Sequence, residues 1–475
     1  MKRIFSTHLL TGLILLMAHP TGFARIIHVP ADQPTIREGI QAPANGDTVA
    51  VSPGEYFENI NFRGKKIVLT SLWYQQRDTS FIRTTIINGS KPAQPDSASC
   101  AIFSHGEDAS CVLQGFTLTG GKGTKWRDIH NGLTYREGGG ILIELSSPVI
   151  RYNIIINNKA ITTGTGIESA GGGGIRIGDG NPQILNNIIA YNQGKYGAGI
   201  VLNYTGAVIR NNLIAYNTGS IQYFGGSGIW SYNVHGTDER LIENNTLVNN
   251  EATTGTGGIL AWSCKLTLRN NIIWGNKPLA KQTYTADGGT LAATYCDIQN
   301  GLAGRGNINL DPLPGEDSFQ LTALSPVIDK GDSTAVYNDP EDAGQPGSAR
   351  KPARGTVRND MGAFGGPGAA VTGYLKNLSS GISTTLVPDG HLLFQNYPNP
   401  ATDYTTISYV LPAAESVILR VTDLSGRIIS NFPVGYDSPG LHRFKLDVSG
   451  LARGNYLYLL EADDRSLVKQ MTVVR

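Results

Sequence analysis

Hydrophobic and polar positions follow one repeated pattern between residues 138 and 276. Each copy has a glycine-rich turn, a strand with alternating residues, a short turn, and a second strand that runs into asparagines. The isoleucines that anchor the first strands are Ile141, Ile175, Ile200, Ile229 and Ile259. An asparagine follows 12 residues later in four copies, at Asn153, Asn187, Asn212 and Asn271, and 16 residues later in the remaining copy, at Asn245. Every copy has a further asparagine five residues on, at Asn158, Asn192, Asn217, Asn250 or Asn276.

This pattern predicts an all-β solenoid. Alternation with a period of two indicates strands rather than helices. One such unit cannot bury its apolar face alone, whereas stacked coils of about two dozen residues bury a continuous aliphatic column. Asparagine suits the turns because it tolerates the left-handed backbone conformation and because its amide can bond its equivalent in the next coil. The alternative is a two-sheet sandwich with Asn-Asn turns, which the fixed spacing disfavours.

The same alternation extends upstream of the repeats. Residues 47–71 and 110–121 contain strand patterns of the same kind. Before them, residues 25–46 predict a strand and a short amphipathic helix that presents Ile36 and Ile40. We expect these two elements to form an N-terminal cap that closes the open end of the solenoid, as terminal repeats must.

Three stretches resemble known families. VPADQPTIREGI and GDTVAVSPGEYFENI, within residues 26–60, resemble the opening of pectin esterases and related β-helix proteins. The asparagine-rich coils resemble the repeat of pectate-lyase-like proteins, and FQLTALSPVIDKGD (319–332) and NDMGAFGG (359–366) are similar to the terminal segment of many secreted bacterial β-helix proteins. This resemblance implies a right-handed parallel β-helix domain over residues 25–366.

The two ends of the chain carry export signals. Residues 1–24 predict a secretory signal peptide, with Lys2 and Arg3 before an apolar run and Gly22-Phe23-Ala24 at the cleavage site. Residues 367–391 indicate a linker, and residues 392–475 predict a small β-sandwich. QNYPNP (395–400), VTDLSGR (421–427) and LDVSGLARGNY (446–456) resemble the C-terminal sorting domain of type IX secretion cargo. The resemblance implies the type IX machinery as a partner and a secreted or cell-surface location; the alternative is a plain adhesion module.

Net charge, hydropathy and cysteine content limit the kinds of partner and site that the chain can have. The formal net charge is +1, and removing Lys2 and Arg3 with the leader leaves −1, so nothing favours nucleic acid as a partner. After the leader, no apolar stretch is long enough to cross a membrane. The spacing of the four cysteines, Cys100, Cys111, Cys264 and Cys296, is not typical of a metal site. In an exported protein they are compatible with two disulfides (Cys100–Cys111 and Cys264–Cys296), with fewer, or with four buried thiols.

Known catalytic motifs are absent from the sequence. The Gly-x-x-Asp-Phe and Gly-Arg-Pro-Trp segments of pectin esterases are missing, as are the Asn-Thr-Asp and Gly-His-Gly of polygalacturonases. A polysaccharide lyase stays open, because its base and its cation or Ca²⁺ come from different coils and leave little local signature. By position alone the candidates are Arg176, Glu144 and Lys195, and for each of them a solvated surface side chain is the favoured alternative.

The alternation also predicts a binding face. If the anchoring isoleucines point inward, the residues after them point outward and form columns along one sheet. One column is Leu142, Arg176, Val201, Trp230 and Leu260; beside it lie Glu144, Asn203, Tyr232 and Trp262, and preceding loops add Tyr196, Tyr223 and Phe224. Aromatic faces beside amides and charges suit sugar rings. The predicted ligand-binding residues are Trp230, Tyr232, Trp262, Asn203, Arg176, Tyr196 and Tyr223, with Trp230 and Trp262 expected to be exposed. The alternative is that these aromatics pack under long loops.

These observations predict an exported β-helix protein that binds extracellular polysaccharide, with processing of the polymer left open. Two alternatives remain. One is a lyase of acidic glycans, for which Ca²⁺ would be the cofactor; the other is a structural adhesin without catalytic activity.

Overall fold

The computed structural model describes residues 24–76, 78–160, 162, 166–232, 240–315, 319–370, 391–393, 395–396, 398–411, 413–437, 440–462 and 465–474. Apart from Ala24, the predicted signal peptide lies outside these residues. Most of the predicted linker, residues 371–390, lies outside them as well.

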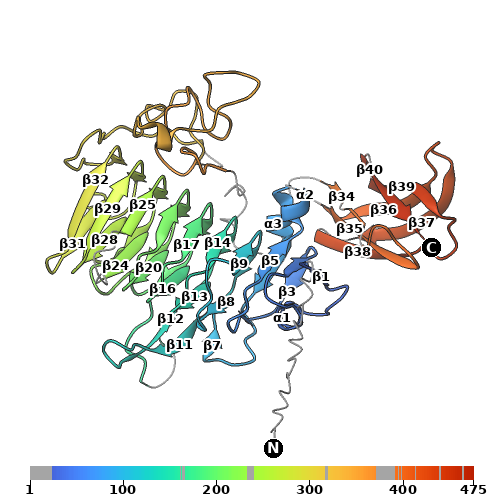
Figure 1. The fold of residues 1–475 in the computed structure, drawn as a ribbon, viewed down its shortest axis with the longest axis horizontal. Coiled ribbons are helices and arrows are strands. Elements are labelled where there is room, and N and C mark those ends of the chain that lie inside the picture. The colour runs from blue at the N-terminus through green and yellow to red at the C-terminus, as the bar shows by residue number, and fades with distance from the viewer. Residues whose placement is uncertain are drawn as a thin grey trace, which may run out of the picture.

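Three long parallel sheets wind through the described part of the chain before residue 299 (Figure 1). Sheet A contains β1 (Ile26–Val29), β2 (Thr48–Val51), β5 (Val68–Ser71), β9 (Val112–Gln114), β14 (Val149–Arg151), β17 (Gln183–Leu185), β21 (Val208–Arg210), β25 (Arg240–Glu243), β29 (Lys265–Arg269) and β32 (Thr290–Thr294). Sheet B contains β3 (Gly54–Tyr56), β6 (Thr85–Asn88), β10 (Thr117–Thr119), β15 (Ile154–Ile156), β18 (Ile188–Ala190), β22 (Leu213–Ala215), β26 (Thr246–Val248), β30 (Ile272–Trp274) and β33 (Asp297–Ile298). Sheet C contains β4 (Ile60–Asn61), β8 (Ala101–Phe103), β13 (Ile141–Glu144), β16 (Ile175–Gly178), β20 (Ile200–Asn203), β24 (Ile229–Tyr232), β28 (Ile259–Trp262) and β31 (Thr283–Ala286).

The register confirms the predicted stacking. In sheet C, Ile141 pairs with Ile175, Ile175 with Ile200, Ile200 with Ile229, and Ile229 with Ile259, always between parallel strands. All five isoleucines are fully buried in one aliphatic cluster that runs from Val29 to Ile298. Each coil therefore contributes one strand to each sheet, which is the arrangement of a parallel β-helix; a two-sheet antiparallel sandwich is excluded for these coils.

Two asparagine ladders run along the inside of the turns. In each ladder the side-chain Nδ2 of one asparagine donates to Oδ1 of its equivalent in the next coil, at 2.9–3.2 Å. One ladder joins Asn153, Asn187, Asn212, Asn245 and Asn271, and the other joins Asn158, Asn192, Asn217, Asn250 and Asn276. The predicted amide bonding between coils is therefore confirmed.

The prediction that the ladder asparagines adopt the left-handed backbone conformation is wrong. The left-handed residue is the one before each ladder asparagine, as at Asn186 (φ 53°) and Asn211 (φ 56°). That position also holds tyrosine, as at Tyr191 (φ 54°) and Tyr216 (φ 55°). The ladder asparagines are thus required for their amides, because each amide satisfies buried backbone carbonyls as well as its neighbour.

All four cysteines are free and buried, so neither candidate disulfide forms. Two of them end the asparagine ladders. The Cys100 thiol donates to Asn158 Oδ1 at 3.3 Å, and Cys296 Sγ accepts from the backbone N–H of Asn271 at 3.4 Å. Burial raises the pKa of both thiols to about 12. They behave as small buried residues rather than as reactive groups.

The strand and the short helix predicted before the first coils are both present. Helix α1 (Ile36–Gln41) begins after Thr35, whose Oγ1 accepts from the N–H of Glu38 at 3.1 Å, and Ile36 and Ile40 are buried in the aliphatic cluster. Two further short helices, α2 (Trp73–Gln76) and α3 (Ser80–Thr84), lie in the loop between β5 and β6. Between β33 and residue 370 the described chain is mostly irregular, with a short 3₁₀ helix at Ala335–Tyr337. Residues 359–366 return along the solenoid to bond the turns at Asn211 and Asn244.

The C-terminal part forms two antiparallel sheets around their own core. One contains β34 (Leu392–Leu393), β35 (Tyr404–Leu411) and β38 (Gly440–Asp447). The other contains β37 (Ile428–Asp437), β36 (Glu415–Thr422), β39 (Gly454–Ala462) and β40 (Arg465–Val473). Their buried side chains form a separate cluster, as expected for a small sandwich. No helix in the described residues is long and apolar enough to span a membrane.

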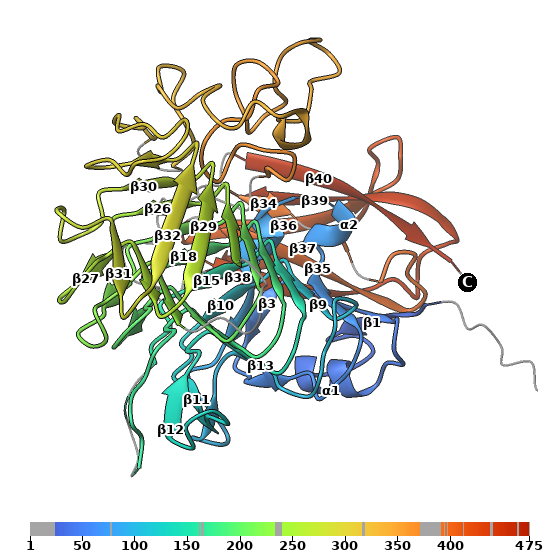
Figure 2. The ribbon, with the colours of Figure 1, turned by 60° about the vertical axis from the view of Figure 1, so that its left-hand side comes forward.

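Two smaller sheets are formed by segments that lie between the strands of sheets A, B and C. β7 (Ser97–Ala98), β11 (Gly123–Arg127) and β12 (Thr134–Glu137) form an antiparallel sheet, and β19 (Gln193–Gly194), β23 (Thr218–Gly219) and β27 (Glu251–Ala252) form a parallel one. The β11–β12 hairpin projects from the coil that leads into β13 (Figure 2). It approaches the outer face of sheet C and contributes one wall of the site described next.

Candidate functional site

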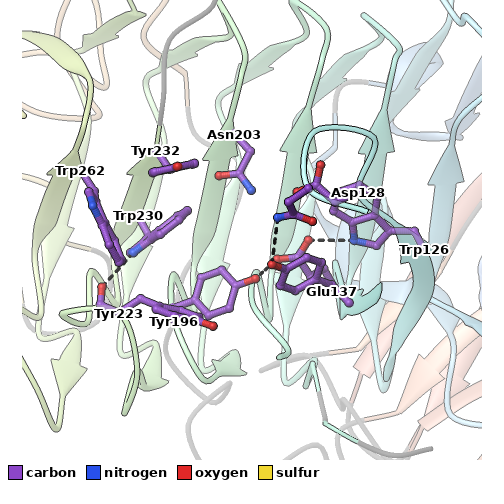
Figure 3. A pocket seen from close by; sticks show the side chains of 11 residues that line it. Trp126, Asp128, Glu137, Tyr196, Asn203, Tyr223, Trp230, Tyr232 and Trp262 are labelled. Atoms are coloured by element: carbon purple, nitrogen blue, oxygen red, sulfur yellow. Dashed lines mark hydrogen bonds between the residues drawn. The ribbon is translucent and has the colours of Figure 1, made fainter. Parts of the chain in front are cut away.

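A cleft of about 170 Å³ lies between the β11–β12 hairpin and the outer face of sheet C (Figure 3). The residues that line it are Trp126, Asp128, Asn131, Tyr135, Glu137, Tyr196, Asn203, Tyr223, Trp230, Tyr232 and Trp262. Six of the seven residues predicted to bind ligand are among them, and the seventh, Arg176, lies beneath the cleft. The lining is mainly aromatic with a few amides and carboxylates, the usual composition of a small-molecule site.

The first outward column is covered, which corrects the expectation that Trp230 is exposed. Leu142 pairs in register with Arg176, and Val201 with Trp230, as predicted, but Trp230 is only 5% exposed and Arg176 only 1%. The reason is that the hairpin and the loops carrying Tyr196 and Tyr223 fold over this column. The predicted exposure of Trp230 is therefore wrong, and the alternative of packing under loops is correct for this column.

The second column is divided: Glu144 and Asn203 are buried, whereas its aromatic members stay at the surface. Tyr232 and Trp262, which pair in register, are partly exposed at the rim of the cleft. Their ring centroids are 5.8 Å apart and the ring planes meet at 78°, so the two rings form a corner. Trp230 supports this corner from below, at 5.8 Å from Tyr232 and 6.0 Å from Trp262. Its Nε1–H donates to the Tyr223 carbonyl at 3.0 Å, which holds the indole in place.

A buried ionic cluster forms the floor. Arg176 Nε donates to Glu137 Oε2 at 3.1 Å, and Arg176 Nη1 pairs with Glu144 Oε2. Glu137 also accepts from Trp126 Nε1 at 2.8 Å and from the Tyr196 hydroxyl. The Arg176 guanidinium lies 3.7 Å from the centroid of the Trp126 ring. Because Glu137 and Trp126 come from the hairpin and Arg176 from β16, this cluster fastens the hairpin to the solenoid.

Burial controls the acid–base behaviour of this floor. It raises the pKa of the Glu137 carboxyl, although Arg176 opposes the rise, and it lowers the pKa of Arg176. Burial also raises the pKa of the Tyr196 hydroxyl and lifts that of Tyr135 to about 12. These phenols therefore stay protonated at neutral pH and do not act as bases, and the Tyr196 hydroxyl donates to Glu137.

The hairpin tip contributes polar groups. Asp128 Oδ1 accepts from the N–H of His130 at 2.8 Å, and Asn131 Nδ2 donates to the Tyr135 hydroxyl at 3.2 Å. His130 stacks on Tyr204 with centroids 3.6 Å apart, and its Nε2 contacts Asp179 Oδ1 at 2.9 Å. The tip is thus held against the coils that carry β16 and β20.

One lining side chain has an unsatisfied polar atom. Asn203, at the end of β20, is only 8% exposed, and among the described residues nothing hydrogen-bonds to its Oδ1. A buried amide oxygen without a partner is costly, and such groups in native structures call for an explanation. Since Asn203 lines the cleft, a ligand that donates a hydrogen bond there would satisfy it.

The three catalytic candidates do not form a centre. Arg176 and Glu144 pair with each other below the cleft, whereas Lys195 follows β19 and lines a different hollow together with Lys159 and Ile221. The expectation of solvated side chains is wrong for Arg176 and Glu144, because both side chains are buried. No group of three or more histidine, cysteine or acidic side chains in the described residues is arranged to hold a metal ion.

The sequence patterns missed the hairpin wall, namely Trp126, Asp128, Asn131, Tyr135 and Glu137. A signal was present: Asn131-Gly132 lies between two alternating runs, and Asn-Gly in that setting is a strong hairpin indicator. Gly132 has φ +72°, a conformation that a glycine adopts without strain. The signal indicates the turn, but it does not show toward which face of the solenoid the hairpin folds.

Comparison with known families matches two parts of the chain. Residues 159–303 match a family model described as the right handed beta helix region, and residues 395–474 match one described as the secretion system C-terminal sorting domain. No curated protein matches the chain. The first match includes β16, β20, β24 and β28 but begins after the hairpin, so it covers the strands under the cleft and not the wall opposite them.

Proposed function

Because this chain is a right-handed parallel β-helix protein with a type IX secretion sorting domain, exported to the cell surface or beyond, we propose that it binds extracellular polysaccharide in the hairpin-covered cleft of sheet C. The observation that carries the proposal is the corner of Tyr232 and Trp262, partly exposed and held rigid by Trp230. Sugar rings offer C–H faces to such rings and hydroxyls to the polar groups beside them.

The size of the cleft limits what it can hold. Its volume of about 170 Å³ is below the roughly 300–1,000 Å³ of pockets that enclose drug-sized ligands. It therefore suits one sugar ring, with the rest of the polymer lying outside along the sheet. Binding of this kind relies on a few rigid aromatic contacts, which lose little conformational entropy when the ligand arrives.

The buried floor gives less support to a lyase of acidic glycans. A lyase needs a cation to neutralise the uronate carboxylate and a base to remove a proton. Arg176 is engaged by two carboxylates below the surface, and the raised pKa of Tyr135 and Tyr196 makes both poor bases at neutral pH. Binding without cleavage therefore fits the described groups better.

Trp262→Ala tests the proposal. We expect it to weaken the best-bound polysaccharide of a panel containing glucans, mannans, xylans, galactans, alginate and polygalacturonate by tenfold or more in affinity electrophoresis, which equals about 1.4 kcal/mol. Phe57→Ala is the control, because Phe57 is an exposed aromatic that does not line the cleft. Retention of no member of the panel by the wild type, or equal effects of the two substitutions, would favour the structural adhesin. Formation of an unsaturated product from alginate or polygalacturonate would favour the lyase.

A further inference from the structure

Building on the proposed function, we infer that the cleft binds uncharged sugar rings and excludes anionic ones. Asp128 and Asn203 are the residues that accept hydrogen bonds from the ring hydroxyls. Uronic acids and sulfated sugars are thereby rejected, although the same fold suits acidic polymers in the enzymes that it resembles.

The charge of the cleft is negative. Its lining includes the carboxylates of Asp128 and Glu137, and no lysine or arginine is among the described lining residues. Below the floor, Arg176 faces Glu137 and Glu144, so this buried cluster contains more acidic than basic groups. Glu168 adds to the negative surroundings, since together with burial it raises the pKa of Tyr223.

Arg176, beneath the cleft, is already engaged by carboxylates, and Arg127 does not line the cleft. The Arg176 guanidinium bonds Glu137 and the Ile143 carbonyl and stacks on Trp126, and Arg127 Nε donates to the Gly132 carbonyl at 3.1 Å. A ligand carboxylate entering the cleft would meet acidic groups without a countercharge from Arg176, which two carboxylates already neutralise. Bringing like charges together in a partly desolvated site is strongly unfavourable.

The atoms left for a ligand are hydrogen-bond acceptors. Asn203 Oδ1 is buried without a partner among the described residues, and Asp128 accepts the His130 N–H through Oδ1, a bond that does not use its Oδ2. Both side chains face the cleft in Figure 3. Hydroxyl groups can donate to both atoms, and a bond from a hydroxyl to a carboxylate is among the stronger hydrogen bonds. A uronate carboxylate is acceptor-only and satisfies neither atom.

Matched sugars provide the test. Hexasaccharides of β-1,4-glucan and β-1,4-glucuronan, and of β-1,4-mannan and β-1,4-mannuronan, share their linkage and differ within each pair only by oxidation of the exocyclic carbon. Titration calorimetry on the full chain should show the neutral member of the best-bound pair binding at least tenfold more tightly. The preference should shrink as sodium chloride is added, because salt screens the repulsion. An equal or tighter acidic member, or a preference that salt leaves unchanged, overturns the inference and leaves the proposed function standing. If no hexasaccharide of either kind binds, both fail.

Asp128→Asn isolates the charge. Asparagine keeps an oxygen for the His130 N–H, so the turn at the hairpin tip should survive. We expect the neutral hexasaccharide to bind a few fold more weakly, because a charged acceptor is lost, and the ratio of neutral to acidic affinity to fall at least fivefold. Asp311→Asn is the matched control, since exposed Asp311 makes the same turn contact, to the N–H of Leu313 at 2.9 Å, outside the cleft. A ratio that changes equally in both variants overturns the assignment of Asp128.

Asn203→Ala tests the second acceptor. Loss of its Oδ1 should weaken the neutral hexasaccharide about tenfold and leave the acidic one unchanged, because the acidic one gains little from this atom. Thermal unfolding of the variant, monitored by circular dichroism, verifies that the fold is intact. Unaltered neutral binding by the folded variant would remove Asn203 from the site.

Discussion

Asn212→Ala in the middle of the first ladder tests whether the asparagine amides hold the coils together. Asn212 Oδ1 accepts from the N–H and the Nδ2 of Asn187 at 2.9 and 3.0 Å. Its own Nδ2 donates to the carbonyls of Ile184 and Arg210 and to Asn245 Oδ1, at 2.8–3.0 Å. Since the two protons of Nδ2 are shared among three acceptors, the side chain accounts for the equivalent of about four full bonds, two accepted and two donated.

The expected loss of stability follows from this count. Each intramolecular hydrogen bond contributes about 1 kcal/mol net, so Asn212→Ala should lower the free energy of unfolding by about 4 kcal/mol. Alanine also leaves buried partners unsatisfied, which makes this a lower bound. Asn181→Ala is the matched control, because exposed Asn181 accepts a single bond, from the N–H of Gly206 at 2.9 Å, and should cost less than about 1 kcal/mol.

Urea unfolding of the full chain, followed by circular dichroism, measures both variants. Asn212→Asp keeps the volume of the side chain but replaces its donors by a carboxylate, so it separates lost hydrogen bonds from an empty cavity. It should destabilise at neutral pH at least as much as alanine does. A cost below about 2 kcal/mol for Asn212→Ala, or a harmless Asn212→Asp, would refute the reasoning.

Two further predictions concern buried charges. Glu137→Ala should cost about 3 kcal/mol or more in urea unfolding, because it removes one of the two carboxylates that neutralise buried Arg176. Glu137→Leu combined with Arg176→Met should cost less than the sum of the single changes, and an additive pair would show that the two groups are not coupled. Burial raises the pKa of Asp297 to about 7, and its Oδ2 has no partner among the described residues. The unfolded chain releases this proton near pH 4 and the folded chain keeps it until about 7, so the contribution of Asp297 to stability is greatest below about pH 4 and is lost as the pH rises to about 7. Each pKa unit corresponds to about 1.4 kcal/mol, so Asp297→Asn should remove a decline on the order of 4 kcal/mol over that range; thermal unfolding profiles that stay parallel for wild type and variant would contradict this.

The repeats were predictable because their information is local. A strand period of two and the constant spacing from Ile200 to Asn212 and Asn217 specify which side chains point inward and which coils align. Even the order of the outward columns could be derived, because a parallel stack in register places equivalent residues next to each other. The N-terminal helix was predictable on the same grounds, from the spacing of Ile36 and Ile40.

The site was only partly predictable. Trp262, Tyr232 and Asn203 follow from the alternation of sheet C, and all three line the cleft. The burial of Trp230 and the pairing of Arg176 with Glu137 did not follow, since they depend on a hairpin that the coil pattern treats as a variable loop. The aromatic positions could be named, whereas the charge of the cleft could not, because Asp128 and Glu137 both lie in or beside that hairpin.

The sequence alone thus determines a stacked coil with an aliphatic interior, two asparagine ladders and an aromatic outer face, because each of these repeats at short range along the chain. Folding in three dimensions turns that face into a cleft, by laying residues 123–137 over strands that come up to 139 residues later. The direction of the hairpin results from contacts between distant segments, such as Trp126 with Arg176 and His130 with Tyr204. Such contacts form only once the coils are stacked, so no periodic pattern in the sequence predicts them.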